Sequence, residues 1–293
     1  MAGFAGLGVM GSAMSGHLLA AGWTVAGYDI DPARLDAHRA SGGACVSSPA
    51  ELAAMADIVV TSLPSGQALL DVTLGPAGLA AAATPGLTVV ETSTLPLEVK
   101  EEARLALADH GAYLLDCTLS GTGAQARSRD LVAYLSGAQP GKDKAAGMLR
   151  AITRSQHDVG EFGNGTKVKM IANLLVTIHN VAAAEALVLA EAAGLDPQTV
   201  LTAVGDGAGS SRMLQVRGPA MAARCYAGPG MRTGLFAKDI DLITAFARQA
   251  GSPVPLFTLA TAFYQAALAQ GRGDEDTACV HAIIRQQAGL AAG

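Results

Sequence analysis

A lysine and an asparagine four positions apart are the residues of this 293-residue sequence best placed to do chemistry. Lys169 and Asn173 lie in a long apolar segment with helical spacing, so their side chains face the same way, one turn apart. A lysine amine can take up or return a proton, and an amide can hold the lysine or a substrate hydroxyl in place. Lys169 and Asn173 are therefore candidate catalytic residues.

A glycine-rich segment at the N-terminus has the pattern of a dinucleotide-binding turn. Gly6, Gly8 and Gly11 stand between a short apolar strand and a helical pattern, and a second strand then ends at Asp29. Glycines at these positions allow a tight turn, let a pyrophosphate approach the backbone and let helix and strand pack closely. A GxGxxG sequence alone also occurs in ordinary turns, but a strand, a helix and an acid in this order predict dinucleotide binding. The predicted cofactor contacts in this segment are Gly6, Leu7, Gly8, Val9, Met10, Gly11 and Asp29.

Asp29 also indicates which dinucleotide is expected. An acid at the end of the second strand accepts hydrogen bonds from the ribose hydroxyls and repels a 2′-phosphate. Ile30 and Asp31, which follow it, add no positive charge. The expected cofactor is therefore NAD rather than NADP.

Further strands and helices alternate along the first half of the chain. This alternation predicts an α/β fold with a Rossmann-type, doubly wound parallel sheet, in which ligands bind at the carboxyl ends of the strands. Leu63 and Pro64 stand at the end of one of these strands and Thr94 follows another. All three are predicted cofactor contacts, although plain loop chemistry would explain them equally well. The expected later strands cover residues 57–63, 87–91, 112–116 and 131–135.

The turn that follows residues 112–116 offers a site for a small anion. Ser120, Gly121 and Thr122 bring two hydroxyls and several backbone N–H groups into a flexible turn. An ordinary glycine loop is the alternative explanation. We expect these three residues to bind the carboxylate of a small substrate.

From residue 166 onward the pattern is wholly helical. One uninterrupted helix is expected over residues 166–193, and five shorter helices follow it. A helix of this length can leave one domain and form the spine of the next. We therefore expect a dinucleotide-binding domain over residues 1–162 and an all-α domain over residues 163–293.

Composition argues against several other classes of protein. The formal net charge is −5 and no basic cluster occurs, which argues against a nucleic-acid partner. The four cysteines are scattered and the six histidines form no ligand spacing, so we expect reduced thiols and no metal site. We see no signal peptide and no long purely apolar span, so a cytoplasmic protein without membrane contact is expected.

The low charge content also bears on assembly. Hydrophobic residues make up 50% of the chain and charged residues only 15%. In a monomer, alanine-rich helices with so few charges would leave large apolar patches exposed to water. A homodimer or homotetramer joined through the helical half is therefore expected.

Taken together, these motifs resemble the β-hydroxyacid dehydrogenase family, which includes 3-hydroxyisobutyrate dehydrogenase. Residues 6–11 are similar to the family's GLGxMG sequence, and residues 92–94 stand at its Ser-Thr cofactor contact. Residues 120–122 fall at its substrate-binding Ser-Gly-Gly, and residues 163–173 resemble its catalytic GxGxxxKxxNN. Lys238 lies at the C-terminal Lys-Asp pair of the family, which implies a cofactor contact, whereas by itself it would be taken for a solvated helix lysine.

The resemblance implies an NAD-dependent oxidoreductase. Hydride would pass between the nicotinamide ring and the carbinol carbon of a small 3-hydroxy acid, or back to a semialdehyde, with Lys169 as general acid/base. A partly buried lysine beside a cationic nicotinamide has its charged form disfavoured, which suits it to take the hydroxyl proton. Thr122 replaces the second glycine of Ser-Gly-Gly and narrows the anion site, so the substrate need not be hydroxyisobutyrate. Ala172 replaces the first paired asparagine, but Asn173 keeps its position relative to Lys169.

Two other functions fit the same scaffold. One is an imine reductase or reductive aminase, but the resemblance implies that such relatives usually lack the lysine, so Lys169 counts against it. The other is a dinucleotide-binding protein without turnover, which would tolerate the loss of both Lys169 and Asn173. Oxidation of a panel of small hydroxy acids with NAD would separate the three functions.

Overall fold

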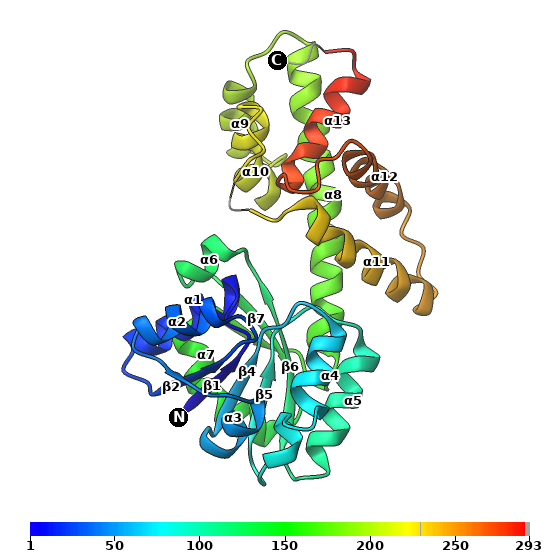
Figure 1. The fold of residues 1–293 in the computed structure, drawn as a ribbon. Coiled ribbons are helices and arrows are strands. Elements are labelled where there is room, and N and C mark those ends of the chain that lie inside the picture. Colours follow the sequence, from blue (N-terminus) through cyan, green and yellow to red (C-terminus); the bar gives the residue numbers. More distant parts are fainter. Residues whose placement is uncertain (229, 291–293) are drawn as a thin grey trace. The chain divides into compact units, whose positions relative to one another are not determined.

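The computed structural model describes residues 1–228 and 230–290 and separates into two compact units. Unit 1 is Met1–Lys169 and unit 2 is Met170–Gly293. The division falls inside helix α8 (Asn164–Ala192), slightly beyond residue 162. Unit 1 carries a sheet with helices, and unit 2 is built of helices (Figure 1).

Unit 1 is organised around an eight-stranded sheet. Its strands are β1 (Ala2–Ala5), β2 (Val25–Tyr28), β3 (Ala44–Cys45), β4 (Ile58–Thr61), β5 (Thr88–Glu91), β6 (Tyr113–Ser120), β7 (Val132–Ser136) and β8 (Ser155–Asp158). Their order in the sheet is β3-β2-β1-β4-β5-β6-β7-β8, and β1 to β6 run parallel. From β1 the chain adds β2 and β3 on one side of the sheet and then β4 to β6 on the other, so the switch point of the topology lies between β1 and β4. A doubly wound sheet binds its ligand at this point. The expected Rossmann sheet is confirmed.

Helices cover both faces of this sheet. They are α1 (Val9–Ala20), α2 (Pro32–Ala40), α3 (Pro49–Met55), α4 (Gly66–Leu74), the 3-10 helix η1 (Leu79–Ala82), α5 (Leu97–Ala108), α6 (Gly123–Arg127) and α7 (Gln139–Ile152). Val60 and Val90 point into the core formed with α1 and α7, whereas Val59 and Val89 point into the core formed with α3, α4 and α5. All four valines are fully buried, as expected for parallel strands covered on both sides (Figure 1).

One edge of the sheet differs from the expected parallel arrangement. β7 pairs antiparallel to β6, and β8 pairs parallel to β7, so both run against the other strands. Residues 121–131 alone connect β6 to β7, which is short for the crossover that a parallel neighbour requires. β6 also continues to Ser120 rather than ending at Asp116, because its last residues pair with β7. β8 is polar and lies at the edge of the sheet, so apolar patterning does not predict it.

Unit 2 confirms the expected all-α second domain. After α8 it contains α9 (Pro197–Gly205), α10 (Arg212–Ala222), α11 (Thr233–Gln249), α12 (Pro255–Ala269), the 3-10 helix η2 (Thr277–Cys279) and α13 (Val280–Gln287). The residues just before α13 do not join it, and this helix begins only at Val280. The cause is Asp276, whose carboxylate accepts from the backbone N–H of Ala278 at 2.8 Å and so caps the short η2 turn instead.

Helix α8 is the one helix in the described part of the chain that is long and apolar enough to cross a membrane. The core helix of a globular domain meets the same criteria, and the polar residues of α8 fit that case. Asn180 is fully buried, and its amide donates to the hydroxyl of Tyr264 at 3.0 Å and to the carbonyl oxygen of Thr277 at 2.8 Å. These bonds fasten α8 to α12 and η2 within unit 2.

Candidate active site

In the glycine turn after β1, backbone atoms lie so close to Gly6 and Gly11 that no side chain would fit there. Gly6 has a φ of 94°, in the left-handed region, and a Cβ there would lie 2.3 Å from the carbonyl oxygen of Ser62. A Cβ on Gly11 would lie 1.9 Å from the carbonyl oxygen of Gly6. Helix α1 begins after Gly8, and no side chain among the described residues caps it. Its first backbone N–H groups are therefore suited to a phosphate.

Asp29 ties this turn to the end of β2. Its buried carboxylate accepts from the N–H of Leu7 at 2.7 Å and from the N–H of Asp31 at 2.9 Å. Oδ2 also accepts from the guanidinium of Arg34 at 3.4 Å, whereas Oδ1 can still accept a further hydrogen bond. The acid is thus oriented by backbone from both sides and retains the capacity to bind ribose hydroxyls.

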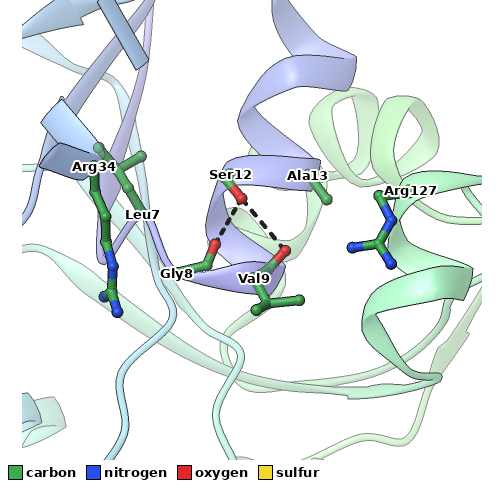
Figure 2. A pocket seen from close by; sticks show the side chains of 7 residues that line it. All are labelled: Leu7, Gly8, Val9, Ser12, Ala13, Arg34 and Arg127. Atoms are coloured by element: carbon green, nitrogen blue, oxygen red, sulfur yellow. Dashed lines mark hydrogen bonds between the residues drawn. The ribbon is translucent and has the colours of Figure 1, made fainter. Parts of the chain in front are cut away.

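Two arginines that the sequence patterns do not identify flank the turn. Arg34 on α2 lies 3.4 Å from Asp29 and 3.4 Å from Asp31. Arg127 on α6 lines the same hollow, which has a volume of about 510 Å³. In Figure 2 the start of α1 lies between the two guanidinium groups. Ile30 and Asp31 add no positive charge, but Arg34, three residues beyond Asp31, brings one close to Asp29.

The position of Arg34 has a local cause. Asp31 is the N-cap of α2 and accepts from the N–H of Ala33 at 3.0 Å, with Pro32 in the first turn. Because Asp31 caps the helix, α2 begins at Pro32, and Arg34 in its first turn lies next to the carboxylate of Asp29. The Asp-Pro pair is the sequence signal that could have placed the arginine.

The other predicted cofactor contacts of unit 1 follow at the same edge of the sheet. Strands β1, β4 and β5 are parallel neighbours in register, so their carboxyl ends lie together. Leu63 and Pro64 follow β4, and Thr94 follows β5. The N–H of Leu63 donates to the hydroxyl of Ser93 at 2.8 Å, which joins the two segments.

The predicted substrate residues stand at the end of β6. Ser120 is the last residue of that strand, and Gly121 has a φ of 142°. Thr122 precedes α6, and its N–H donates to the side-chain oxygen of Gln125 at 3.0 Å. One N–H expected to serve an anion is therefore engaged inside the protein. That the hydroxyls of Ser120 and Thr122 bind a carboxylate stays a prediction.

Position 165, at the start of α8, is packed so closely that only glycine fits there. A Cβ on Gly165 would lie 2.6 Å from the carbonyl oxygens of both Asp116 and Tyr134. Gly165 thus lets α8 begin directly against β6 and β7. Lys169 follows one turn later on the same helix and is half-buried.

Within unit 2, Asp239 joins Asn173 to Lys238, a role that the sequence patterns do not assign to it. The amide nitrogen of Asn173 donates to Oδ2 of Asp239 at 2.9 Å, and Nζ of Lys238 lies 3.3 Å from Oδ1 of the same carboxylate. Asn173 and Asp239 are buried, whereas Lys238 is nearly half exposed. Asp239 therefore orients the amide so that the oxygen of Asn173 can accept a hydrogen bond.

The four cysteines are free thiols, and Cys117 lies beside Asp116 on β6. Burial, followed by the charge of Asp116, raises the pKa of the Cys117 thiol far above its usual range, so it stays protonated and is a poor nucleophile. Across residues 1–228 and 230–290, no three His, Cys, Asp or Glu side chains gather as metal ligands would.

The sheet, the glycine turn and the acid of β2 define a dinucleotide-binding α/β domain, which a helical domain follows. Residues 1–171 match the family model described as the NAD binding domain of 6-phosphogluconate dehydrogenase. Residues 163–284 match the model described as NAD-binding of NADP-dependent 3-hydroxyisobutyrate dehydrogenase. The chain belongs to the β-hydroxyacid dehydrogenase family, and it is an oxidoreductase with NAD-binding domains.

Relatives similar along their whole length support this assignment. L-threonate dehydrogenase of Cupriavidus necator is 34% identical over 283 residues, covering 96% of this chain and 95% of the relative. NAD-dependent L-serine dehydrogenase of Pseudomonas aeruginosa is 30% identical over 288 residues, 96% of each chain. The structure of 3-hydroxyisobutyrate dehydrogenase from Mycobacterium tuberculosis with L-serine has a TM-score of 0.87 at 28% identity, covering 97% of this chain and 98% of that one.

The imine reductases are more distant. The imine reductase of Streptomyces aurantiacus covers 97% of this chain and 99% of its own, with a TM-score of 0.62 and 20% identity. A likeness at that level of identity shows a shared fold and carries no argument about activity.

Proposed function

We propose that this protein transfers a hydride between NAD and the carbinol carbon of a small 3-hydroxy acid, with Lys169 as general acid/base. The observation that supports this most is in unit 1, where a glycine turn fastened to Asp29 occurs together with a half-buried lysine on α8. The dinucleotide fits the turn, because backbone atoms fill the space that a side chain would need at Gly6 and Gly11. This close packing keeps the turn tight, and no side chain caps the first N–H groups of α1, which a phosphate could bind. When bound, NAD supplies the hydride acceptor.

The protein's own contribution is orientation and proton transfer. The amine of Lys169 takes the proton of the substrate hydroxyl as the alcohol is oxidised and returns it in the reverse reduction. In its ammonium form the same group stabilises the negative charge that develops on the alkoxide oxygen. Asn173, oriented by Asp239, holds the lysine or the hydroxyl in the reacting geometry.

The residues at the end of β6 and the relatives support the proposed substrate class. L-Threonate, L-serine and 3-hydroxyisobutyrate, named for the relatives, are all small hydroxy acids. In this chain, the hydroxyls of Ser120 and Thr122 would bind the carboxylate. Thr122 adds a methyl and a hydroxyl where the family has glycine, so the preferred acid need not be 3-hydroxyisobutyrate.

We expect NAD to be preferred over NADP because of the charges at the end of β2. Asp29 and Asp31 share Arg34, so this group of three side chains has two negative charges and one positive charge. A 2′-phosphate would add further negative charge beside the two carboxylates. The ribose hydroxyls of NAD instead find an acceptor in Asp29.

A panel of substrates tests the proposal. Purified protein is assayed by NAD reduction with L-threonate, L-serine, 3-hydroxyisobutyrate and the matching neutral alcohols, and with cyclic imines in the reductive direction. We expect turnover with at least one acid, and none with the matching alcohol or with imines. Turnover of imines alone would support the reductase alternative, and binding of NAD without any turnover would support a non-catalytic protein.

A further inference from the structure

A buried lysine of unit 1 has no part in the proton transfer just described. Lys100 on α5 is completely buried. Its ammonium group donates to Oδ1 of Asp116 at 2.7 Å, to the carbonyl oxygen of Ser93 at 2.7 Å and to the hydroxyl of Thr166 at 3.0 Å. These partners use all three donors of the group, and such pairing is what makes a buried ammonium tolerable.

The three side chains form a closed network, the Lys100–Asp116–Thr166 network. The hydroxyl of Thr166 donates to Oδ1 of Asp116 at 2.8 Å, and the backbone N–H of Thr166 donates to Oδ2 at 2.7 Å. Thr166 lies in the first turn of α8, where a carboxylate is stabilised by the unpaired N–H groups and the helix dipole. Asp116 therefore fastens the start of α8 to β6.

Two neighbouring bonds strengthen the same junction. The hydroxyl of Ser136 on β7 accepts from the N–H of Gly165 at 3.0 Å and donates to the carbonyl oxygen of Asp116 at 3.0 Å. The hydroxyl of Thr118 donates to the carbonyl oxygen of Gly165 at 2.8 Å. Gly165, the residue before Thr166, is thus held through both its N–H and its carbonyl oxygen.

The network also extends to the carboxyl ends of β4 and β5, where the cofactor contacts are predicted. The ammonium of Lys100 donates to the carbonyl oxygen of Ser93, and the hydroxyl of Ser93 accepts from the N–H of Leu63. Glu91 accepts from the N–H of Ser93 at 2.6 Å, and its carboxylate lies 4.0 Å from the ammonium of Lys100. A single buried ammonium therefore connects the segments after β4 and β5 to the turn of α8 that precedes Lys169.

We infer that the Lys100–Asp116–Thr166 network positions Lys169 for proton transfer by holding the first turn of α8 against the Ser93 segment. Lys100, Asp116 and Thr166 are positioning residues that act through the backbone of α8. The inference rests on the proposed function of Lys169. It predicts that loosening the network lowers kcat while cofactor binding is largely kept.

Thr166→Val tests the inference with a small change. It removes the hydroxyl that bridges Lys100 and Asp116 but keeps the shape of the side chain and the backbone bond to Asp116. A displacement of the lysine by a fraction of an ångström to an ångström should lower kcat by about tenfold to a hundredfold. The KM for NAD should change by less than about threefold. Thr166→Ser restores the hydroxyl and should restore most of the lost kcat.

Thr153→Val is the matched control. Thr153 is also a buried threonine, its hydroxyl bonds to the carbonyl oxygen of Leu149 at 2.7 Å, and it lies at the end of α7 away from the network. This variant should keep kcat within about twofold of the parent protein. If Thr166→Val does not fold, Thr166→Ala removes the same hydroxyl in a residue that favours helix.

The possible results separate this inference from the proposed function. A Thr166→Val variant with the kcat of the parent protein would overturn the positioning role, as would equal losses in Thr166→Val and Thr153→Val or no rescue by Thr166→Ser. If Lys169→Ala keeps full activity, the proposed role of Lys169 fails, whatever Thr166→Val shows. If Lys169→Ala is inactive and Thr166→Val is fully active, the positioning inference alone fails.

Discussion

The charges around Asp29 should decide which dinucleotide this protein uses. Because Asp29 and Asp31 outnumber Arg34, a 2′-phosphate meets net negative charge at the end of β2. With one charged hydrogen bond worth about 1.5–3 kcal/mol, we expect kcat/KM to favour NAD over NADP by about tenfold or more. Asp31→Asn removes one carboxylate from Arg34 and should reduce that ratio. Equal or better use of NADP by the parent protein would contradict the prediction.

Ser120 should contribute to binding of the substrate and not of the cofactor. Ser120→Ala removes one hydroxyl from the expected carboxylate site, so the KM for the acid should rise by roughly tenfold to a hundredfold. The KM for NAD should stay unchanged. Ser128→Ala, at the other end of α6, is the control, because its exposed hydroxyl bonds only to nearby carbonyl oxygens of α6 among the described residues. Similar effects of the two substitutions would show that Ser120 has no special contact with the acid.

Single residues of the site could be predicted from the sequence only where a motif carried them. Asp29 and Lys169 stand at defined distances from characteristic glycines, and the close contacts at Gly6 and Gly165 explain those glycines physically. Lys100 gives no such signal. It lies among glutamates in a helical pattern, as a solvated lysine does, and its burial results from β6 and α8 packing around it.

Among the elements, those with a strong internal pattern were predicted and those defined by their partners were not. From Thr166 onward α8 shows an apolar stripe without proline or glycine, and β4 and β5 are short runs rich in β-branched residues, so each is visible in its own sequence. The reversed direction of β7 and the extension of β6 to Ser120 depend on pairing between strands. Local periodicity contains no information about that pairing.

Helix α13 carries a histidine that should make unit 2 sensitive to acid. His281 is fully buried, and burial lowers its pKa to about 4, although Glu191 at 3.4 Å favours the charged form. In the unfolded chain the pKa is about 6.5, so below that pH the unfolded state takes up a proton that the folded state resists. Stability should therefore fall from about pH 6.5 toward pH 4, by about 2 kcal/mol between pH 7 and pH 5.

Denaturant unfolding of the parent protein and of His281→Asn at pH 7 and pH 5 measures this effect. Asparagine retains a group that can bond to the hydroxyl of Tyr226, which lies 2.9 Å from Nδ1 of His281, but it does not titrate. The variant should lose most of the difference between the two pH values. The same difference in both proteins would show that other groups cause it.

For the whole molecule, we expect self-association through unit 2. Large apolar side chains are exposed on its helices, with Leu189 70%, Leu256 65% and Leu259 66% exposed. Leucines this exposed on one helical unit favour burial against a second copy. Light scattering at micromolar concentration should therefore show a dimer or tetramer, and a species of 29.5 kDa alone would contradict this.

A charge placed on this surface tests the prediction further. Leu259→Glu should weaken the oligomer, because a carboxylate would have to be buried between the copies. Leu105→Glu on α5 is the control, since Leu105 is 53% exposed but lies in unit 1. Equal effects of the two substitutions on the measured mass would argue against an interface in unit 2.

The most direct measurement for the account as a whole is the activity of Lys169→Ala beside that of Lys167→Ala. Both variants remove a lysine from the first turns of α8, but Lys167 is exposed and bonds to Asn164 at 3.3 Å in its own helix. With the best acid of the panel at neutral pH, Lys169→Ala should lose about a hundredfold or more in kcat and keep its affinity for NAD. Lys167→Ala should retain the activity of the parent protein. Substantial turnover by Lys169→Ala would contradict the account, because another residue would then have to move the proton.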